Sequence, residues 1–262
     1  MTLEYFNELT NTGCAPPDQI AAIKAGPSNR TAFLTNGRTD PAKLSRLRDQ
    51  GYTIRFGNLQ RWLPVFHRIS RGIQQETGYS NYMHAFLTPG GEQGLLHHWD
   101  QQMALIVQVA GTKTWQLWKP LIEAPMREYN ESFRVWREDF IPAWEAAGPD
   151  LTVELTAGQT LLLPRGWVHN PHALHHDEPS LHLTFAIRER TPLWLAEQLI
   201  ARAIEEPDFR RVVLPADLEL PILADRLSET RQALVKFLGE LDTAEMADLT
   251  RQAAVTELEY TT

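Results

Sequence analysis

The sequence predicts a mainly β fold with flanking helices, in which a sandwich or barrel of short strands precedes a small α-helical domain. Two observations lead to this prediction. From residue 82 to residue 185, short apolar segments alternate with turns rich in Gly and Pro, as in sandwiches and barrels. After Thr191 the apolar residues recur at helical spacing instead. We therefore expect a barrel domain at residues 1–190 and a helical domain at residues 191–262.

The N-terminal segment, residues 1–77, is expected to add helices and one strand that pack on the barrel. Its first part, residues 1–38, is weakly patterned. Asp40 as the N-cap and Pro41 as the first helical residue predict a short helix. Alternating apolar residues at 52–56 then predict a strand.

A longer helix is expected after that strand. Asn58 can cap it, and an apolar stripe at helical spacing follows. Pro64 should kink or interrupt this helix, because proline lacks an N–H and its ring clashes with the preceding turn. Gly78 is expected to end it.

The central region is predicted to hold the barrel strands. They are residues 82–88, 94–109, 113–118, 152–155, 160–163, 167–170 and 180–187, with a helical insertion at 132–147. Side chains alternate along a strand, so His98 and Asp100 of the second strand point the same way and His97 points the other way. Ala104 and Ile106 share the face of the first two, which has the mixed character of a ligand-holding lining.

Composition and charge exclude several classes. Lys and Arg number 25 against 33 Asp and Glu, a net charge of −8 without a basic stripe, so direct binding of nucleic acid is not expected. Cys14 is the only cysteine, which excludes an internal disulfide and a multi-cysteine zinc site and fits a reducing compartment. We find no secretory signal and no apolar run near the ~18 residues that span a membrane. A cytoplasmic protein without membrane contact is expected.

The spacing of His98 and Asp100 allows both side chains to bind one metal ion. Two histidines and one carboxylate on one face of an octahedron are typical of non-haem Fe(II) oxygenases, which keep the other positions open. The third ligand should then come from a strand across the barrel. Taken alone, a His-x-Asp pair is more often plain surface or core polarity.

Later histidines compete for the third position. They are His169, His172, His175, His176 and His182. His169 follows a buried strand and a tight turn, which places it at a barrel mouth and favours it. His175 and His176 lie in a polar stretch that is expected to be a loop, and His182 better suits a group behind the ligands. Spacing alone leaves the choice open, because the whole run could be a solvated loop.

Several motifs resemble those of the JmjC-type cupin oxygenases, and most of all the ribosomal oxygenase subgroup. They are LTPGGEQGLLHHWD at 87–100, QVAGTKTW at 108–115, MREY at 126–129, LPRGWVH at 163–169 and SLHLT at 180–184. The resemblance covers residues 78–190 and implies a double-stranded β-helix, the cupin or jelly-roll barrel. The helices after residue 190 resemble the family's dimerisation helices. The subgroup's C-terminal winged-helix domain is not expected in these 262 residues.

Carried over by position, the resemblance implies catalytic and ligand roles. It makes His98, Asp100 and His169 the iron ligands, and it makes Lys113 the residue that binds the distal carboxylate of the co-substrate 2-oxoglutarate. A cation in a partly dry barrel is a natural partner for that carboxylate. Without the resemblance, Lys113 would simply be a solvated lysine on a strand.

Two nearby positions depart from the subgroup. Phe86 stands where these oxygenases often have a tyrosine, on a strand that helps line the co-substrate pocket. His84 lies two residues earlier on the same face. We expect the lining of this pocket to differ accordingly.

The implied activity is that of an Fe(II)- and 2-oxoglutarate-dependent dioxygenase. It would hydroxylate an amino-acid side chain of a protein or peptide, with a ribosomal protein as one candidate, while O2 and 2-oxoglutarate give succinate and CO2. Alternative enzymes are a hydroxylase of a free amino acid, natural-product peptide or other small molecule, a methyl-lysine demethylase and a zinc hydrolase. Outside the enzymes, a catalytically idle cupin that binds a partner is the alternative.

The helical domain predicts a homodimer. The apolar stripes of its helices are too broad to face a single barrel wall. Packing of the helices on the barrel is the other interpretation. The state of association in solution distinguishes the two.

Overall fold

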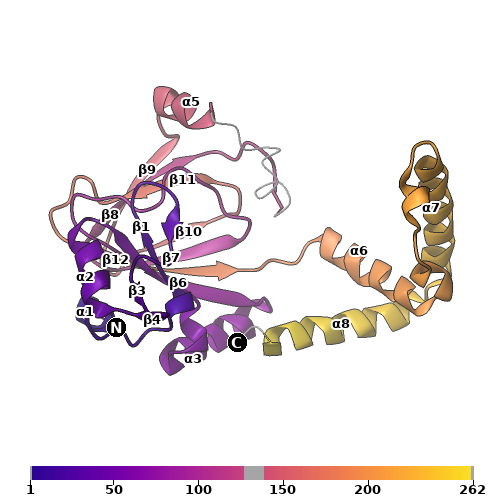
Figure 1. The fold of residues 1–262 in the computed structure, drawn as a ribbon, viewed down its shortest axis with the longest axis horizontal. Helices are drawn as coiled ribbons and strands as arrows, with labels where there is room; N and C mark the ends of the chain where they lie inside the picture. The colour runs from indigo at the N-terminus through magenta and orange to yellow at the C-terminus, as the bar shows by residue number, and fades with distance from the viewer. Residues whose placement is uncertain (1, 127–138, 261–262) are drawn as a thin grey trace. The chain divides into compact units, whose positions relative to one another are not determined.

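The computed structural model describes residues 2–126 and 139–260. Two compact units divide the chain, residues 1–189 and residues 190–261 (Figure 1). The first unit contains every strand of the two large sheets, and the second is helical.

Two antiparallel sheets form the body of the first unit. The larger has the strand order β10-β7-β12-β6-β5-β1-β2 and the smaller the order β11-β8-β9. The larger sheet consists of β1 (Ile20–Ile23), β2 (Ser28–Asn29), β5 (Thr53–Phe56), β6 (Asn81–Thr88), β7 (Met103–Ala110), β10 (Thr160–Leu163) and β12 (Ser180–Ile187). The smaller consists of β8 (Thr112–Trp118), β9 (Leu151–Thr156) and β11 (Val168–His172), and β3 (Leu34–Thr35) pairs with β4 (Arg38–Thr39). This sandwich followed by helices confirms the predicted fold class.

The large sheet buries one face in the main hydrophobic core. Along β6, Met83, Ala85 and Leu87 are fully buried there, and the alternate residues point to the other face. Phe6 and Phe66, from two N-terminal helices, fill the same core. The helices therefore cover the outer face of this sheet and leave its inner face to line a cavity.

The N-terminal residues that the sequence left unassigned are ordered into α1 (Leu3–Thr12) and the 3₁₀ helix η1 (Pro17–Gln19). Thr2 caps α1 by accepting a hydrogen bond from the N–H of Tyr5. Gly13 ends it in the left-handed region at φ 63°. Phe6 and Leu9 are its buried apolar residues, too few to make a clear helical pattern in the sequence.

The next helices begin and end at the predicted residues, with one correction. α2 (Pro41–Asp49) begins as expected, with the Asp40 carboxylate accepting hydrogen bonds from two backbone N–H groups. The longer helix does not begin at Asn58, which makes no side-chain cap. After the short η2 (Leu59–Arg61), α3 (Pro64–Thr77) starts at Pro64, since proline suits the first helical turn, where its missing N–H needs no partner. Gly78 ends α3 as predicted.

The helical insertion is described only from α5 (Phe140–Ala147) onward. The expected start of this insertion at residue 132, and most of the MREY motif, lie outside the described residues.

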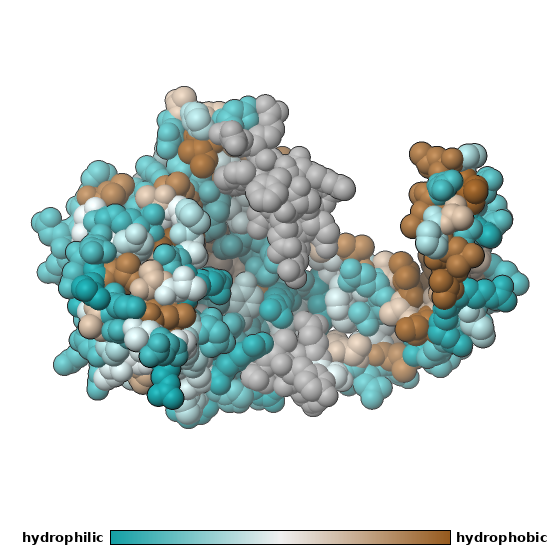
Figure 2. Space-filling model, in the orientation of Figure 1, coloured by the Kyte–Doolittle hydropathy of each residue, from teal (hydrophilic) through white to brown (hydrophobic). Residues whose placement is uncertain are grey.

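The second unit is built from α6 (Pro192–Ala201), α7 (Ile222–Glu240) and α8 (Thr243–Tyr260), with the 3₁₀ helices η3 (Arg202–Glu205), η4 (Pro207–Arg210) and η5 (Pro215–Leu218) between them. Among its described side chains, the buried apolar ones are Ala203 and Met246. Figure 2 shows hydrophobic residues along the surface of α7. None of the helices in the described part of the chain is both long and apolar enough to cross a membrane.

Candidate metal centre and adjoining cavity

A cavity of about 220 Å³ opens between the two sheets. The loop between β6 and β7 supplies His98 and Asp100 to its wall. The small sheet supplies Lys113 and Trp115 from β8 and His169 from β11, and the large sheet lines the remainder. The residues singled out in the sequence as ligands and co-substrate group therefore surround one space.

His98 and Asp100 are not in a strand, and this part of the prediction was wrong. β7 begins only at Met103. His98 instead forms an isolated antiparallel bridge with His169, in which each N–H donates to the other's carbonyl at 3.1 and 2.7 Å. The predicted strand began too early, because the segment before Met103 pairs with a neighbour only at His98 and does not form a continuous ladder. This one bridge still brings the two imidazoles together, with ring centroids 4.1 Å apart.

Both imidazoles are held in one tautomer by the backbone. Nδ1 of His98 lies 2.6 Å from the carbonyl oxygen of Leu96, and Nδ1 of His169 lies 3.0 Å from that of Trp167. A carbonyl only accepts, so each Nδ1 carries the proton and donates. Each Nε2 then keeps its lone pair for a ligand, as in histidines that bind metals.

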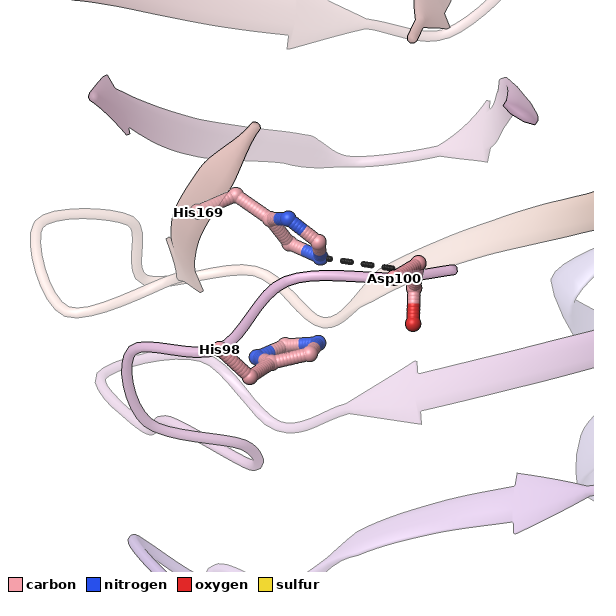
Figure 3. Close-up of side chains that lie close together, drawn as sticks. All are labelled: His98, Asp100 and His169. Carbon is pink, nitrogen blue, oxygen red and sulfur yellow. Dashed lines mark ion pairs between the residues drawn. The ribbon is translucent and has the colours of Figure 1, made fainter. Parts of the chain in front are cut away.

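Asp100 completes a triad with these two nitrogens. Its Oδ2 lies 3.7 Å from Nε2 of His169, and the ligand atoms of all three residues lie within 4.8 Å of one another. Figure 3 shows the three side chains pointing toward one another. The carbonyl of Asp100 accepts a hydrogen bond from the N–H of Gly166, which ties the loop to the turn before β11. Two imidazole nitrogens and one carboxylate at this spacing fit a metal site.

The electrostatics of the triad favour neutral histidine. Burial, and after it the neighbouring His98, lowers the pKa of His169 to about 4. The imidazole is therefore uncharged near neutral pH. Only the neutral form can bind a metal ion, so the site needs no deprotonation step there.

Lys113 is a buried cation without a counter-ion. It is 2% exposed, and its Nζ donates to the hydroxyl of Thr88 at 2.8 Å, which also receives a hydrogen bond from Thr53. No carboxylate of the described residues pairs with it. Burial lowers the pKa of Lys113 to about 7. An unpaired ammonium in a dry cavity is a binding site for an anion.

The inner face of the large sheet adds residues that the sequence did not single out. Thr88 and Thr53 hold Lys113, and Tyr82 and Arg55 line the same cavity further along their strands. The alternation at 52–56 and 82–88 did indicate which side chains share a face. It did not indicate that this face was the one turned to the site.

The remaining histidines take other places. His182 lines the cavity, stacked on Phe86 with ring centroids 4.8 Å apart, and its expected role behind the ligands stays a prediction. His175 and His176 lie in a turn, also as expected. His97 points away from the cavity and packs on Trp118 and Trp144, which agrees with the predicted alternation. Of the five competing histidines, the structure brings His169 to the His98–Asp100 pair.

The fold and the triad define a cupin-type sandwich with a candidate metal centre, and the family follows from sequence comparison. The JmjC domain family matches residues 56–193. The chain belongs to the JmjC domain family, which confirms the family resemblance.

Its relatives are longer proteins. The chain is 30% identical over 229 residues to the bifunctional lysine-specific demethylase and histidyl-hydroxylase NO66 of Aedes aegypti, covering 80% of this chain and 35% of that one. It is 30% identical over 186 residues to ribosomal oxygenase 1 of Danio rerio, covering 69% and 33%. It therefore spans about a third of the length of these relatives. The crystal structure of Escherichia coli ycfD shares the fold, with a TM-score of 0.50 and 14% identity over 90% of this chain and 60% of that one.

Proposed function

We propose that the protein is an Fe(II)- and 2-oxoglutarate-dependent dioxygenase that hydroxylates an amino-acid side chain of a protein or peptide. The observation that carries the proposal is one cavity lined by both the His98–Asp100–His169 triad and the unpaired Lys113. A metal site alone would fit several chemistries. A buried cation in the same cavity adds a place for a co-substrate that ends in a carboxylate.

The triad would hold the iron through two Nε2 atoms and a carboxylate oxygen, leaving further coordination positions open. When bound, Fe(II) with 2-oxoglutarate and O2 supplies the oxidant that inserts one oxygen atom into a C–H bond, with succinate and CO2 as the other products. The carbonyls of Leu96 and Trp167 fix the direction of both imidazoles and keep the metal-binding nitrogens free of protons.

Lys113 would bind the distal carboxylate of 2-oxoglutarate. A carboxylate beside the amine favours the ammonium form and raises the pKa from the value of about 7 that burial gives it. Thr88 fixes the position of Nζ by accepting its hydrogen bond. Because the surroundings are dry, this contact would be a strong charge-assisted hydrogen bond that orients the co-substrate toward the triad.

The relatives support a protein substrate. One is described as a demethylase and histidyl-hydroxylase, and another as a ribosomal oxygenase. Ribosomal proteins and peptides derived from them are therefore the first substrates to test. Hydroxylation adds one oxygen atom to the peptide, whereas demethylation of a methyl-lysine removes a methyl group as formaldehyde, so mass spectrometry with a formaldehyde assay separates the two reactions.

The test of the class is succinate formation from 2-oxoglutarate with Fe(II) under air. We expect iron-dependent succinate from the wild type, none above background from His98→Ala, and a much higher requirement for 2-oxoglutarate in Lys113→Ala. His97→Ala is the matched control, because its imidazole is next in sequence but faces away from the cavity. Failure of Fe(II) and 2-oxoglutarate to bind in a titration would contradict the proposal and favour an idle binding module.

We also propose that residues 190–261 mediate a homodimer. These helices leave large apolar side chains exposed, including Leu227 at 61% and Val235 at 66% on α7. Unpartnered apolar surface of this kind is typical of an interface between subunits. Light scattering during size exclusion at micromolar concentration should give twice the subunit mass, and a monomer would contradict the dimer.

A further inference from the structure

A second hollow of about 550 Å³ adjoins the metal cavity and has three arginines in its lining. We call it the arginine pocket, after Arg30, Arg55 and Arg188 in its lining. It shares Arg55, Tyr82 and His84 with the wall of the metal cavity. Asp18 is the one carboxylate in its described lining, against three guanidinium groups.

Arg55 occupies the junction between the two hollows. It lies on β5 beside Phe86 of β6, two residues beyond Thr53, on the face of the sheet that lines the metal cavity. The side chain is half-buried, and its Nε is fully buried without a hydrogen-bond partner in the described part of the chain. A buried guanidinium N–H left without an acceptor costs free energy.

The guanidinium groups of Arg30 and Arg188 add to the positive charge around Arg55. Arg188 lies over the ring of Tyr82, with Cζ 5.1 Å from the ring centroid. Burial lowers the pKa of Arg55 and the charge of Arg30 lowers it further, while Tyr82 raises it and no carboxylate contributes an opposing effect. Arg30 and Arg188 are exposed and Arg55 is half-buried, and like charges gathered around one hollow are stabilised when an anion binds between them.

The lining of the arginine pocket reaches Tyr82, at the opposite end of β6 from the Thr88 that contacts Lys113, and Arg55, opposite Phe86, lies between these two ends. Lys113 contacts Thr88, and Tyr82 is six residues earlier in the strand, which corresponds to about 20 Å. Burial, and after it the charge of Asp100, raises the pKa of Tyr82, and both residues line the metal cavity. A group bound near Tyr82 in the arginine pocket would therefore lie away from Lys113.

We propose that the arginine pocket binds a carboxylate carried by the substrate near the carbon that is hydroxylated. The inference rests on the proposed function, because it assigns the second anion site of that same cavity to the substrate. Guanidinium groups match a carboxylate through paired N–H donors, which makes arginine suited to this recognition. The carboxylate belongs to an acidic side chain of a peptide, to a chain terminus or to a free amino acid. A cationic methyl-lysine would meet like charges there.

Paramagnetic relaxation by Mn(II) in the metal site tests this without turnover. Protein with Mn(II) and saturating 2-oxoglutarate is mixed with one probe at a time, and the proton relaxation of the probe is measured by NMR. N-acetyl-aspartic acid α-amide represents an acidic side chain, N-acetylglycine a chain terminus and glycine a free amino acid. N-acetylasparagine amide and N-acetylglycinamide are the neutral counterparts.

We expect at least one carboxylate probe to relax strongly while the neutral probes do not. Arg55→Gln should weaken its binding about tenfold, because a charge-assisted contact is lost. Arg188→Gln should weaken it less, and it keeps the test valid if Arg55→Gln does not fold. Arg55→Lys should retain part of the binding, and Arg68→Gln, an exposed arginine of α3 outside both hollows, should have no effect.

Four outcomes would overturn the inference. Equal relaxation of the acids and their neutral counterparts would show that the pocket does not select a carboxylate. Loss of 2-oxoglutarate relaxation in Arg55→Gln would assign Arg55 to the co-substrate instead. If Mn(II) does not relax 2-oxoglutarate in the wild type, the proposed function fails, and this inference fails with it. If Mn(II) relaxes 2-oxoglutarate but none of the probes, only this inference is overturned.

Discussion

The two units of the chain differ in where their apolar side chains lie. In the first unit, Phe6, Phe56 and Phe66 are completely buried in one cluster. In the second, Ala203 and Met246 are the buried apolar residues among the described side chains, although its helices contain many leucines and valines. The first unit can therefore derive its stability from its own core, whereas the helical unit needs another surface to cover its apolar residues.

This difference also explains where chemistry can occur. The core covers the outer face of the large sheet, so the inner face is rigid and can hold charged groups at fixed positions. The described residues that line the cavity around the triad and Lys113 belong to the first unit. Changes in the first unit should alter activity or folding, and changes in the helical unit should alter association.

The largest expected effect is the loss of activity on removal of a ligand. Asp100→Ala should reduce Fe(II)-dependent succinate formation at least about 100-fold, since it removes one of three metal ligands. The carboxylate is 44% exposed, so folding and the mass of the assembly should be unchanged in thermal denaturation and light scattering. An unchanged rate would remove Asp100 from the site, and a change in association would contradict the separation of roles.

A core substitution should distinguish the two units by stability. Phe56→Ala should lower the free energy of unfolding by about 3–5 kcal/mol, because it leaves a cavity in the main cluster. The matched variant Leu227→Ala, on the exposed surface of α7, should change it by less than about 0.5 kcal/mol at a protein concentration at which the chain is monomeric. Urea denaturation followed by tryptophan fluorescence measures both. Equal losses would mean that the units share one core.

Lys113→Met should be more stable than the wild type near neutral pH and should not bind 2-oxoglutarate. The folded-state pKa of Lys113, about 7, is below the ordinary lysine value, so the unfolded chain binds the proton more tightly. Between pH 7 and pH 9, the free energy of unfolding of the wild type should thus rise by about 2 kcal/mol relative to that of the variant. Urea titrations at both pH values measure the gain, and a constant difference would show that Lys113 is not buried in the free protein.

The smallest effect is expected for Val235→Ser on α7, which should change association and leave folding almost unchanged. It should weaken the proposed dimer about tenfold, because it places a hydroxyl in an apolar interface. Leu162→Ser is the matched control, since Leu162 is 57% exposed on β10 of the first unit. Sedimentation at several concentrations measures the dissociation constant. An equal effect of both variants would place the interface outside the helical unit.

Much of the fold could be predicted where neighbouring residues determine the backbone conformation. The carboxylate of Asp40 caps α2, Gly78 ends α3, and the strand at 180–187 has the predicted bounds. Prediction failed where a segment lacks a clear period, as in α1, or where strand character depends on a partner, as at His98. Neither failure could be avoided from sequence, because the pairing partner of a residue is set by distant parts of the chain.

The candidate site shows the same division. The sequence by itself determined the residue types of the metal centre, because two histidines and a carboxylate have few other reasons to occur together in these motifs. Spacing alone left five histidines open and the resemblance implied His169, and the tertiary structure brings His169 to the pair through two backbone hydrogen bonds with His98. It also turned Arg55 and Thr88 toward the cavity. Burial and cross-strand register, which give Lys113 its unpaired charge and Arg55 its orphaned N–H, exist only once the two sheets have packed.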